Sequence, residues 1–298
     1  ERCIEVFKDF AKNNHQAKLI VTTKPGKRPA LADGIKVATS EIVALVDSDT
    51  VWDEDSRAGM LAPFIDPLVG GVGTRQDVLE TDTLAKRLFN IHLDHRYFDE
   101  MPFLARSGNA LTCLSGRTAL YRHTAIIPVV DEMVNETFWG KHCISGEDKC
   151  LTRLVQASGW HTRYQMNVCV RTHGMPKLSS FFKQQVRWIR NSWRSDLKSL
   201  AGGWIWRREK MLAFHMVDRF IQPFTLMFGP IYLVLSIIWG QWLVVVVLIV
   251  WWHFSRAIKI YPHLRHRPAD LLILPAYVLS SYIIGLIKIY DLFTLNEQ

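Results

Sequence analysis

The long apolar runs of this chain all lie in its last quarter, and this distribution constrains the fold more than any single motif. Before residue 221 apolar and charged residues are mixed, whereas later stretches are almost wholly apolar. The apolar stretches cover residues 224–240, 242–254 and 271–287. A helix needs about 17–25 mostly apolar residues to span a bilayer. The pattern therefore predicts a folded domain followed by a membrane region with about three spans.

The boundaries of these parts follow from the same distribution. We expect a folded domain over residues 1–200, an interfacial helix region over 201–223 and a transmembrane region over 224–298. Residues 211–221 alternate apolar and polar positions at helical spacing. That spacing suits either a helix lying in the plane of the lipid headgroups or an ordinary packed helix.

The first two apolar stretches allow two arrangements. They form either one long tilted helix over 224–254 or a hairpin of two spans joined at residues 239–242. The segment before Phe224 and the segment 255–270 are both basic. Positively charged flanks favour the cytosolic side, and a hairpin keeps both of them there. We therefore expect the hairpin, with the folded domain in the cytosol and a multi-pass location in the plasma or inner membrane.

Charge and cysteine content exclude some classes of function. Lysine and arginine number 36 against 28 aspartates and glutamates, which gives a net charge of +8. The basic residues crowd between Arg171 and Lys210, and the sequence contains no nucleic-acid-binding motif. We interpret them as a flank that contacts membrane lipid, and expect no nucleic acid as a partner. Five cysteines without a CxxC pair argue against a disulfide framework and against a zinc site.

The folded domain has the pattern of an α/β protein. Apolar runs at residues 18–22 and 41–46 predict buried strands, with a helix over 29–38 between them. A strand, a helix and a strand joined by short connections indicate a parallel sheet. Further elements are expected as helices over 4–11, 53–63, 83–99, 146–158 and 177–200 and a strand over 69–74.

Two carboxylates directly follow the second predicted strand, as Asp47–Ser48–Asp49. Open α/β sheets bind their ligands at the carboxyl ends of strands. Two carboxylates one residue apart are hard oxygen ligands for Mg²⁺ or Mn²⁺. A metal ion held there can neutralise the charge of a departing diphosphate. The alternative is a solvated helix cap that leads into Trp52 and Asp53.

Two further motifs carry groups suited to chemistry. Glu147 and Asp148 follow Gly146 at the start of a predicted helix, whose N-terminus favours ionised carboxylates. They suit a general base, or an acidic first turn with no further role. The sequence Gln184–Gln185–Val186–Arg187–Trp188 lies in a basic, aromatic helix. Its arginine offers a donor fork for phosphate and its tryptophan a face for a sugar ring, unless the helix simply rests on lipid.

The order of these motifs resembles that of processive family 2 glycosyltransferases. A DxD motif, a GED triplet about a hundred residues later, a QxxRW motif about thirty-five residues after that, and then apolar spans follow one another. The chain is similar over essentially its whole length to hyaluronan synthases, bacterial chitin-oligosaccharide synthases and, more remotely, cellulose synthases. Lys27–Arg28 resembles the family's GKRxA stretch, and residues 113–122 (CLSGRTALYR) resemble a hyaluronan synthase stretch near the acceptor. Arg117 stands where those enzymes usually carry proline.

The resemblance implies a GT-A fold, which is Rossmann-like with a mostly parallel sheet, and a UDP-sugar as donor. It implies that Mg²⁺ or Mn²⁺ binds Asp47 and Asp49, of which Asp49 is the better candidate for direct ligation. Asp148 is the implied general base and Glu147 a supporting group. The implied substrate-binding residues are Lys27, Arg28, Asp47, Asp49, Ser115, Gly116, Gln184, Gln185, Arg187 and Trp188. The family's first strand and uracil-binding acid are expected upstream of Glu1, so that the sequence is a fragment.

The implied reaction is a single displacement with inversion, which adds sugars to the end of a growing β-linked polysaccharide. The GED triplet, found in chitin-oligosaccharide synthases, points first to N-acetylglucosamine. Alternation of N-acetylglucosamine with glucuronate is the second choice. Three other readings remain: a non-processive enzyme that glycosylates a lipid phosphate, a catalytically inactive membrane scaffold of the same fold, and a basic membrane-surface binding module.

Overall fold

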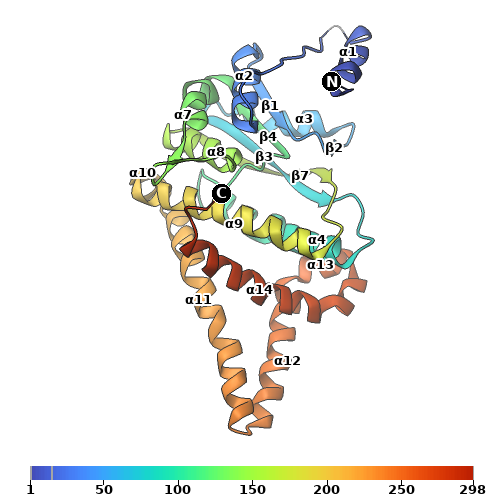
Figure 1. Ribbon diagram of the computed structural model, residues 1–298, viewed down its shortest axis with the longest axis vertical. Coiled ribbons are helices and arrows are strands. Elements are labelled where there is room, and N and C mark those ends of the chain that lie inside the picture. The colour runs from blue at the N-terminus through green and yellow to red at the C-terminus, as the bar shows by residue number, and fades with distance from the viewer. Residues whose placement is uncertain (1, 15, 298) are drawn as a thin grey trace.

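The computed structural model describes residues 2–14 and 16–297. An α/β domain forms one end of the molecule and a helical region the other (Figure 1). In the same view the sheet lies above the long helix α9 (Leu178–Ala201), and a pair of helices projects below it. The expected order, an α/β domain followed by apolar helices, is confirmed.

The main sheet has five strands, in the order β1-β4-β3-β7-β2. The strands are β1 (Ile42–Val46), β2 (Thr50–Trp52), β3 (Val69–Val78), β4 (Thr118–Arg122) and β7 (His161–Thr172). Neighbours β3 and β7 are parallel, whereas the other three pairs are antiparallel. Three strands, β1, β3 and β7, therefore run in one direction and two run in the other. The sheet is mixed, and a separate small hairpin joins β5 (Thr137–Phe138) to β6 (Lys141–His142).

Helices cover the sheet and enclose the main core. Those of the first 210 residues are α1 (Arg2–Lys12), α2 (Lys27–Val37), α3 (Ser56–Leu61), α4 (Leu84–His95), α5 (Met101–Ser107), α6 (His123–Ile126), α7 (Val130–Val134), α8 (Glu147–Ala157), α9 and α10 (Trp204–Arg208). Thr83 caps α4, because its hydroxyl accepts from the Lys86 N–H at 3.3 Å. Leu114, Tyr121 and Leu151 are fully buried in this core.

The prediction of a strand over residues 18–22 is wrong. These residues have no regular secondary structure, and within the described chain no strand pairs with them. Leu19 and Val21 are consequently exposed. Strand β1 then lies at the edge of the sheet, and its alternate residues are exposed instead of being covered on both faces. An apolar run supplies the side chains of a strand, but the strand itself requires a partner for its backbone hydrogen bonds.

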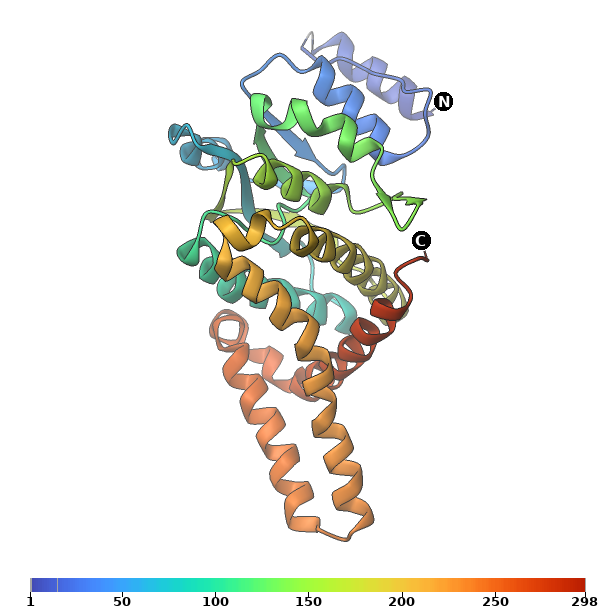
Figure 2. The ribbon, with the colours of Figure 1, turned by 90° about the vertical axis from the view of Figure 1, so that its left-hand side faces the viewer.

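Three helices of the C-terminal region are long and apolar enough to cross a membrane. They are α11 (Lys210–Ile238), α12 (Trp242–Lys259) and the stretch Pro268–Phe293, in which a 3₁₀ turn precedes α14 (Leu274–Phe293). Helices α11 and α12 run side by side to a common tip (Figures 1 and 2), where Gly240 adopts a φ of +66°. The hairpin prediction is confirmed.

The segment expected as an interfacial helix belongs to α11 itself. This helix continues without a break through Pro223 and Pro230. Its first part is packed against the domain, since Leu212, Ala213 and Met216 are buried in the main core. The packed-helix alternative therefore holds for residues 211–221.

Helix α14 and the residues that follow it bind α9 through hydrogen bonds. The indole N–H of Trp193 donates to the carbonyl of Lys288 at 2.9 Å, and Arg194 Nε donates to the carbonyl of Leu295 at 2.9 Å. Between the hairpin and α14, helix α13 (Tyr261–His266) lies beside α4 (Figure 1). All five cysteines are free, as expected, and three of them are buried.

Candidate active site

The three motifs meet in one cavity of about 390 Å³, here called the central cavity. Asp47 and Asp49 reach it from the turn between β1 and β2, and Asp148 reaches it from the first turn of α8. Trp188 closes it from α9. Residues as far apart in sequence as 47 and 188 therefore share a single space, at the end of β1 where the sequence predicted a ligand.

Most of the remaining expected residues also line the central cavity. They are Lys27, Ser115, Gly116, Glu147, Gln184 and Arg187. Gln185 is not among the lining residues, because on α9 it is displaced by about 100° from Gln184.

Arg28 does not line the central cavity either, although Lys27 beside it does. Its side chain is buried and donates to the Met133 carbonyl at 2.5 Å, the Ser145 carbonyl at 2.9 Å and the Glu136 carboxylate at 2.9 Å. Successive residues of a helix project about 100° apart, so Lys27 and Arg28 at the start of α2 serve different faces. Arg28 therefore joins α2 to the loop before α8.

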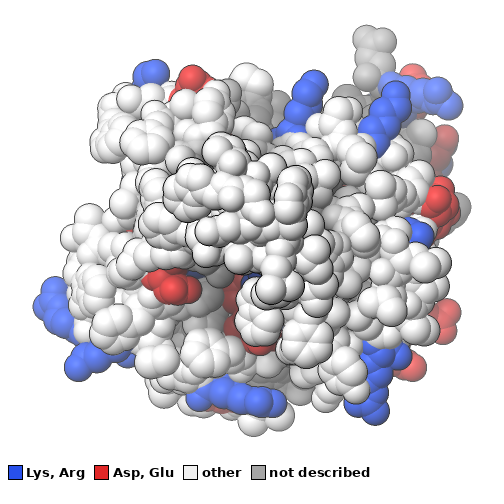
Figure 3. Space-filling model, turned by 90° about the horizontal axis from the view of Figure 1, so that it is seen from below, with Lys and Arg blue, Asp and Glu red and all other residues white. Residues whose placement is uncertain are grey.

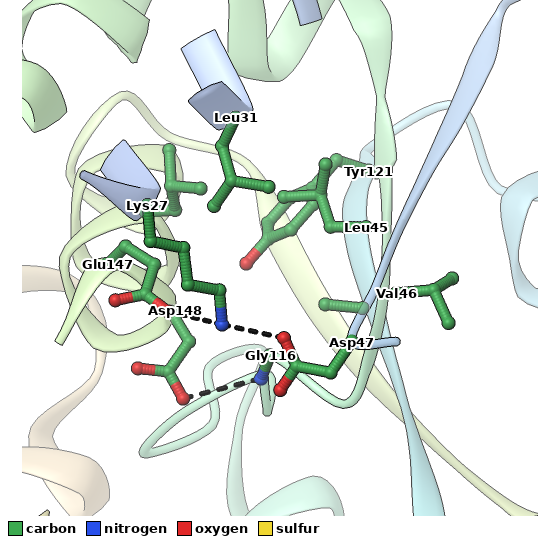
Figure 4. A pocket seen from close by; sticks show the side chains of 11 residues that line it. Lys27, Leu31, Leu45, Val46, Asp47, Gly116, Tyr121, Glu147 and Asp148 are labelled. Atoms are coloured by element: carbon green, nitrogen blue, oxygen red, sulfur yellow. Dashed lines mark hydrogen bonds and ion pairs between the residues drawn. The ribbon is translucent and has the colours of Figure 1, made fainter. Parts of the chain in front are cut away.

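Lys27 joins the carboxylates of two motifs. Its ammonium group lies 2.6 Å from Asp47 Oδ1 and 2.7 Å from Glu147 Oε1. Figure 4 shows it pointing between these two side chains, with Leu31 and Leu45 on the other side of an adjoining small pocket. Burial alone would lower the pKa of Lys27, but the hydrogen bonds and charges of Asp47 and Glu147 outweigh it and raise the pKa. Lys27 is thus a fixed cation beside the DxD motif.

Asp148 is held by backbone donors. Its Oδ2 accepts from the Gly116 N–H at 3.3 Å, which is drawn in Figure 4, and its Oδ1 accepts from the Lys149 N–H at 2.8 Å. These two hydrogen bonds fix the position of the carboxylate. An anchored carboxylate in a cavity suits a proton acceptor.

The turn before Asp148 depends on a glycine. Gly146 has a φ of +83°, a left-handed conformation that side chains disfavour. A Cβ atom there would also lie 2.9 Å from Cγ of Asn191 on α9. Only a glycine therefore allows α8 to start this close to α9, which places Asp148 opposite the QxxRW motif.

Trp188 packs against side chains instead of standing free. Its ring centroid lies 5.8 Å from that of Phe89, and the guanidinium carbon of Arg117 lies 5.3 Å from its centroid. One turn earlier on α9, the side-chain oxygen of Gln184 is buried without a hydrogen-bond partner. A buried acceptor of this kind is costly unless a ligand donates to it.

The donor set fits a divalent cation only when a ligand completes its shell. Among residues 2–14 and 16–297 no group of three or more His, Cys, Asp or Glu side chains is arranged to hold a metal ion. Asp47 and Asp49 nevertheless both line the central cavity. Mg²⁺ is commonly held by one or two carboxylates together with water and substrate phosphates. Asp47 and Asp49 could provide the carboxylates of such a shell.

Sequence reasoning missed several residues of the central cavity. Gln76 from β3, Arg96 after α4, Arg117 before β4 and Asn191 from α9 all line it. The side-chain nitrogen of Gln76 and the Nε of Arg96 are buried without partners. These residues carry no motif of their own, because the sheet and the two helices bring them together from separate regions. Arg117 alone gave a signal, as a departure from proline.

A larger cavity of about 620 Å³ lies among α4, α11, α12 and α14, and is here called the membrane-side cavity. Its lining is polar and includes His92, His95, Glu100 and Lys259. Burial lowers the pKa of His92 to about 3 and that of His95 to about 4, so both rings are neutral at pH 7. Figure 3, seen from the hairpin tip, shows a mostly uncharged face with a hollow that has acidic side chains beside it.

The chain matches one protein family and several named relatives. Residues 2–191 match the family model described as glycosyltransferase like family 2, and the chain belongs to that family. A type 2 glycosyltransferase from Pyricularia oryzae is 27% identical over 94% of this chain and 61% of its own length. An N-acetylglucosaminyltransferase from Rhizobium meliloti is 26% identical over 94% of this chain and 69% of its own length. One from Azorhizobium caulinodans is 31% identical over 59% of this chain and 44% of its own length.

The chain spans about 60% of the length of the fungal relatives that it matches. Because Asp47, Asp49, Asp148 and Trp188 lie within the matched residues 2–191, the site that the geometry defines is part of the family domain.

Proposed function

We propose that this protein is a membrane-bound, inverting glycosyltransferase that transfers a sugar from a UDP-sugar to the end of a growing β-linked polysaccharide. The observation that carries the proposal is the shared cavity of Asp47, Asp49, Asp148 and Trp188. The proposed sugar is N-acetylglucosamine, alone or alternating with glucuronate, and the relatives named N-acetylglucosaminyltransferase support it. The domain over residues 1–200 then lies in the cytosol, and the apolar helices cross the plasma or inner membrane.

In this proposal Asp148 is the general base. A sugar hydroxyl is a poor nucleophile at neutral pH, so a base within hydrogen-bond reach is required. Asp148 removes the proton of the acceptor hydroxyl, whose oxygen attacks the anomeric carbon of the donor. The bond from that carbon to the diphosphate breaks, and UDP leaves with the bonding electrons. Attack from the face opposite the leaving group inverts an α-linked donor to a β-linked product.

The cations of the central cavity suit the departing UDP. Lys27 lies beside the DxD motif and Arg187 faces the same space from α9. Fixed positive groups that face developing negative charge stabilise a transition state. Asp47 and Asp49 would hold Mg²⁺ or Mn²⁺, which when bound supplies additional positive charge to the diphosphate. The unpartnered oxygen of Gln184 would accept a hydrogen bond from a hydroxyl of the acceptor end.

The membrane-side cavity suits a hydrophilic product. A polysaccharide cannot cross lipid unaided, and this cavity is lined by polar groups from α4, α11, α12 and α14. Neutral histidines such as His92 offer hydrogen bonds without binding the polymer through charge. We infer that the product leaves along these helices, and that the basic stretch 171–210 contacts lipid beside them.

The test is product formation from single UDP-sugars and from pairs of them, in membranes that carry the full-length protein. Digestion by chitinase, hyaluronidase or cellulase identifies the polymer, and a lipid carrying a single sugar would contradict processivity. We expect Asp148→Asn to lower polymer formation by about 10²–10⁴-fold while UDP binding survives. The matched control is Asp131→Asn, an exposed acid in the first turn of α7. Near-normal turnover by Asp148→Asn would remove Asp148 from the mechanism.

A further inference from the structure

Arg117 is a buried arginine whose guanidinium faces the central cavity. The side chain leaves the strand end beside Asp47, since the Asp47 N–H donates to the Arg117 carbonyl at 3.3 Å. It is only 9% exposed, yet it lines the central cavity. Its guanidinium lies 5.2 Å from the Phe89 ring centroid and 5.3 Å from that of Trp188. Aromatic contacts of this kind fix the plane of the guanidinium without using its N–H donors.

The hydrogen bonds of Arg117 are incomplete. Nη1 donates to Oε1 of Gln76 at 2.7 Å, and within the described residues this is the single hydrogen bond of the guanidinium. No carboxylate of the described chain forms an ion pair with it. Within the described residues no hydrogen bond is found for Nε or Nη2, although the residue lines the central cavity. Several donors of a buried guanidinium are thus left without a protein partner.

Arg122, at the far end of β4, is an arginine with a full set of protein partners. It lies over an aromatic ring as well, 5.6 Å from the Phe64 centroid. Its guanidinium, however, pairs with the Glu41 carboxylate and donates to the carbonyls of Val69 at 3.2 Å and Phe64 at 2.8 Å. Arg122 is therefore structural, whereas Arg117 has the same support and lacks the partners.

A second guanidinium in the cavity strengthens the contrast. Arg96 also lines the cavity, donates only to the Cys113 carbonyl at 3.3 Å, and has a buried Nε without a partner. No ion pair involves Arg96 within residues 2–14 and 16–297. A buried charge is expensive unless a counter-charge or hydrogen bonds compensate it. Asp47 and Asp49 act on Arg117 through space and Asp148 acts on Arg96, but within the described residues no acid forms an ion pair with either guanidinium. The free donors of both guanidiniums are therefore open to an anionic ligand.

We propose that Arg117, backed by Arg96 and held flat by Trp188 and Phe89, binds an anionic oxygen group of the substrate. The inference rests on the proposed function and adds a specificity-determining residue to it. A planar guanidinium with free edge donors binds phosphate or carboxylate through two parallel hydrogen bonds. Two sources offer that chemistry: the diphosphate of the UDP-sugar, or the carboxylate of a uronic acid unit. In both cases one face of the Trp188 ring contacts the guanidinium of Arg117 and holds it in place.

The experiment measures binding by titration calorimetry with the full-length protein in detergent. The ligands are uridine, UDP, UDP-glucose and UDP-glucuronate. Arg117→Met removes the donors but keeps the aliphatic stem that packs against Trp188, and Arg117→Lys keeps the charge without the planar fork. Arg122→Met, at the far end of β4, is the matched control. Thermal unfolding establishes that each variant is folded, and Arg117→Lys carries the comparison should Arg117→Met fail that criterion.

We expect wild-type affinity to fall about 10- to 100-fold in Arg117→Met, the range for losing a charge-assisted hydrogen bond. A loss for UDP but not for uridine assigns Arg117 to the diphosphate. A loss for UDP-glucuronate alone, with UDP and UDP-glucose unchanged, assigns it to a carboxylate. Affinities for all four ligands within threefold of Arg122→Met overturn the inference. Absence of nucleotide binding by the wild type would instead contradict the proposed function, and this inference with it.

Discussion

Within the described residues Glu136 forms ion pairs with three cations, and replacing it tests how the site is supported. Its carboxylate is 8% exposed and accepts from Arg28 of α2, Arg153 of α8 and Lys198 of α9, each at 2.9 Å. One buried acid therefore connects the helix that carries Lys27, the helix that carries Asp148 and the helix that carries Trp188. Glu136→Gln keeps the shape of the side chain and removes its charge.

The magnitude follows from burial and charge. Burial would raise the pKa of Glu136, but the Lys198 hydrogen bond and the charges of Arg28 and Arg153 outweigh it and lower the pKa to about 2. A fall from the ordinary 4.5 corresponds to about 3 kcal/mol of folding free energy, at about 1.4 kcal/mol per pKa unit. Removing one partner of a buried pair costs about 3–5 kcal/mol. Both routes predict a loss of about 3–5 kcal/mol.

The assay is thermal unfolding of the purified full-length protein. A loss of 3–5 kcal/mol corresponds to a Tm decrease of about 6–20 °C in a domain of this size. The control is Asp131→Asn, which breaks the Lys36–Asp131 pair at 2.6 Å. Both partners there are exposed, so a loss of about 0–1 kcal/mol is expected. Equal Tm values for the two variants would refute the reasoning.

The same argument sets a pH dependence. Because the pKa of Glu136 is lowered by folding, its contribution is complete above about pH 4.5 and is lost as the pH falls toward about 2. Wild type should therefore lose more stability than Glu136→Gln between pH 5 and pH 3. Parallel stability curves over that window would show that the charge of Glu136 contributes nothing.

Two further variants address the carboxylate and glycine turns of the site. Asp49→Ala should weaken UDP binding at least tenfold in the presence of Mg²⁺ or Mn²⁺ and little in its absence; calorimetry with and without a chelator measures this, and unchanged metal dependence would count against the cation site. Gly146→Ala should destabilise the protein by roughly 1–2 kcal/mol and reduce turnover, because its φ is +83° and its Cβ would meet Asn191. Its control is Gly34→Ala in α2, where the added methyl meets nothing within 4 Å and should stabilise slightly; equal behaviour of the two alanine variants would contradict the role of the turn.

Local signals made part of the structure predictable from sequence. The carboxylates at positions 47 and 49 follow an apolar strand, and Gly146 marks a helix start, so their chemistry could be placed without knowledge of the fold. The hairpin of α11 and α12 was predictable because hydropathy and flanking charge act on each segment separately. The family resemblance then connected the motifs that local reasoning left apart.

The remaining features depend on contacts between distant segments. Residues 18–22 have the side chains of a strand, but pairing decides whether a strand forms. Arg28 and Lys27 are neighbours in sequence, yet the position of Glu136 directs one of them inward and leaves the other at the site. The pairing of Gln76 with Arg117 requires β3 and β4 to lie side by side, which no local pattern specifies.

A buried charge network connects helix α11 to the helix that carries Asp148. Lys149, the residue after the proposed base, donates to Asp196 of α9 at 3.0 Å, and Arg219 of α11 donates to the same carboxylate at 2.9 Å. Asp196 has no exposed surface, so its charge is stable there only while both cations stay bound to it. A displacement of α11 relative to α9 would break the bond from Arg219. Lys149 alone would then have to compensate the buried charge of Asp196. Helix α11 therefore helps to fix the helix that carries Asp148, and the apolar C-terminal helices contribute to the geometry of the site.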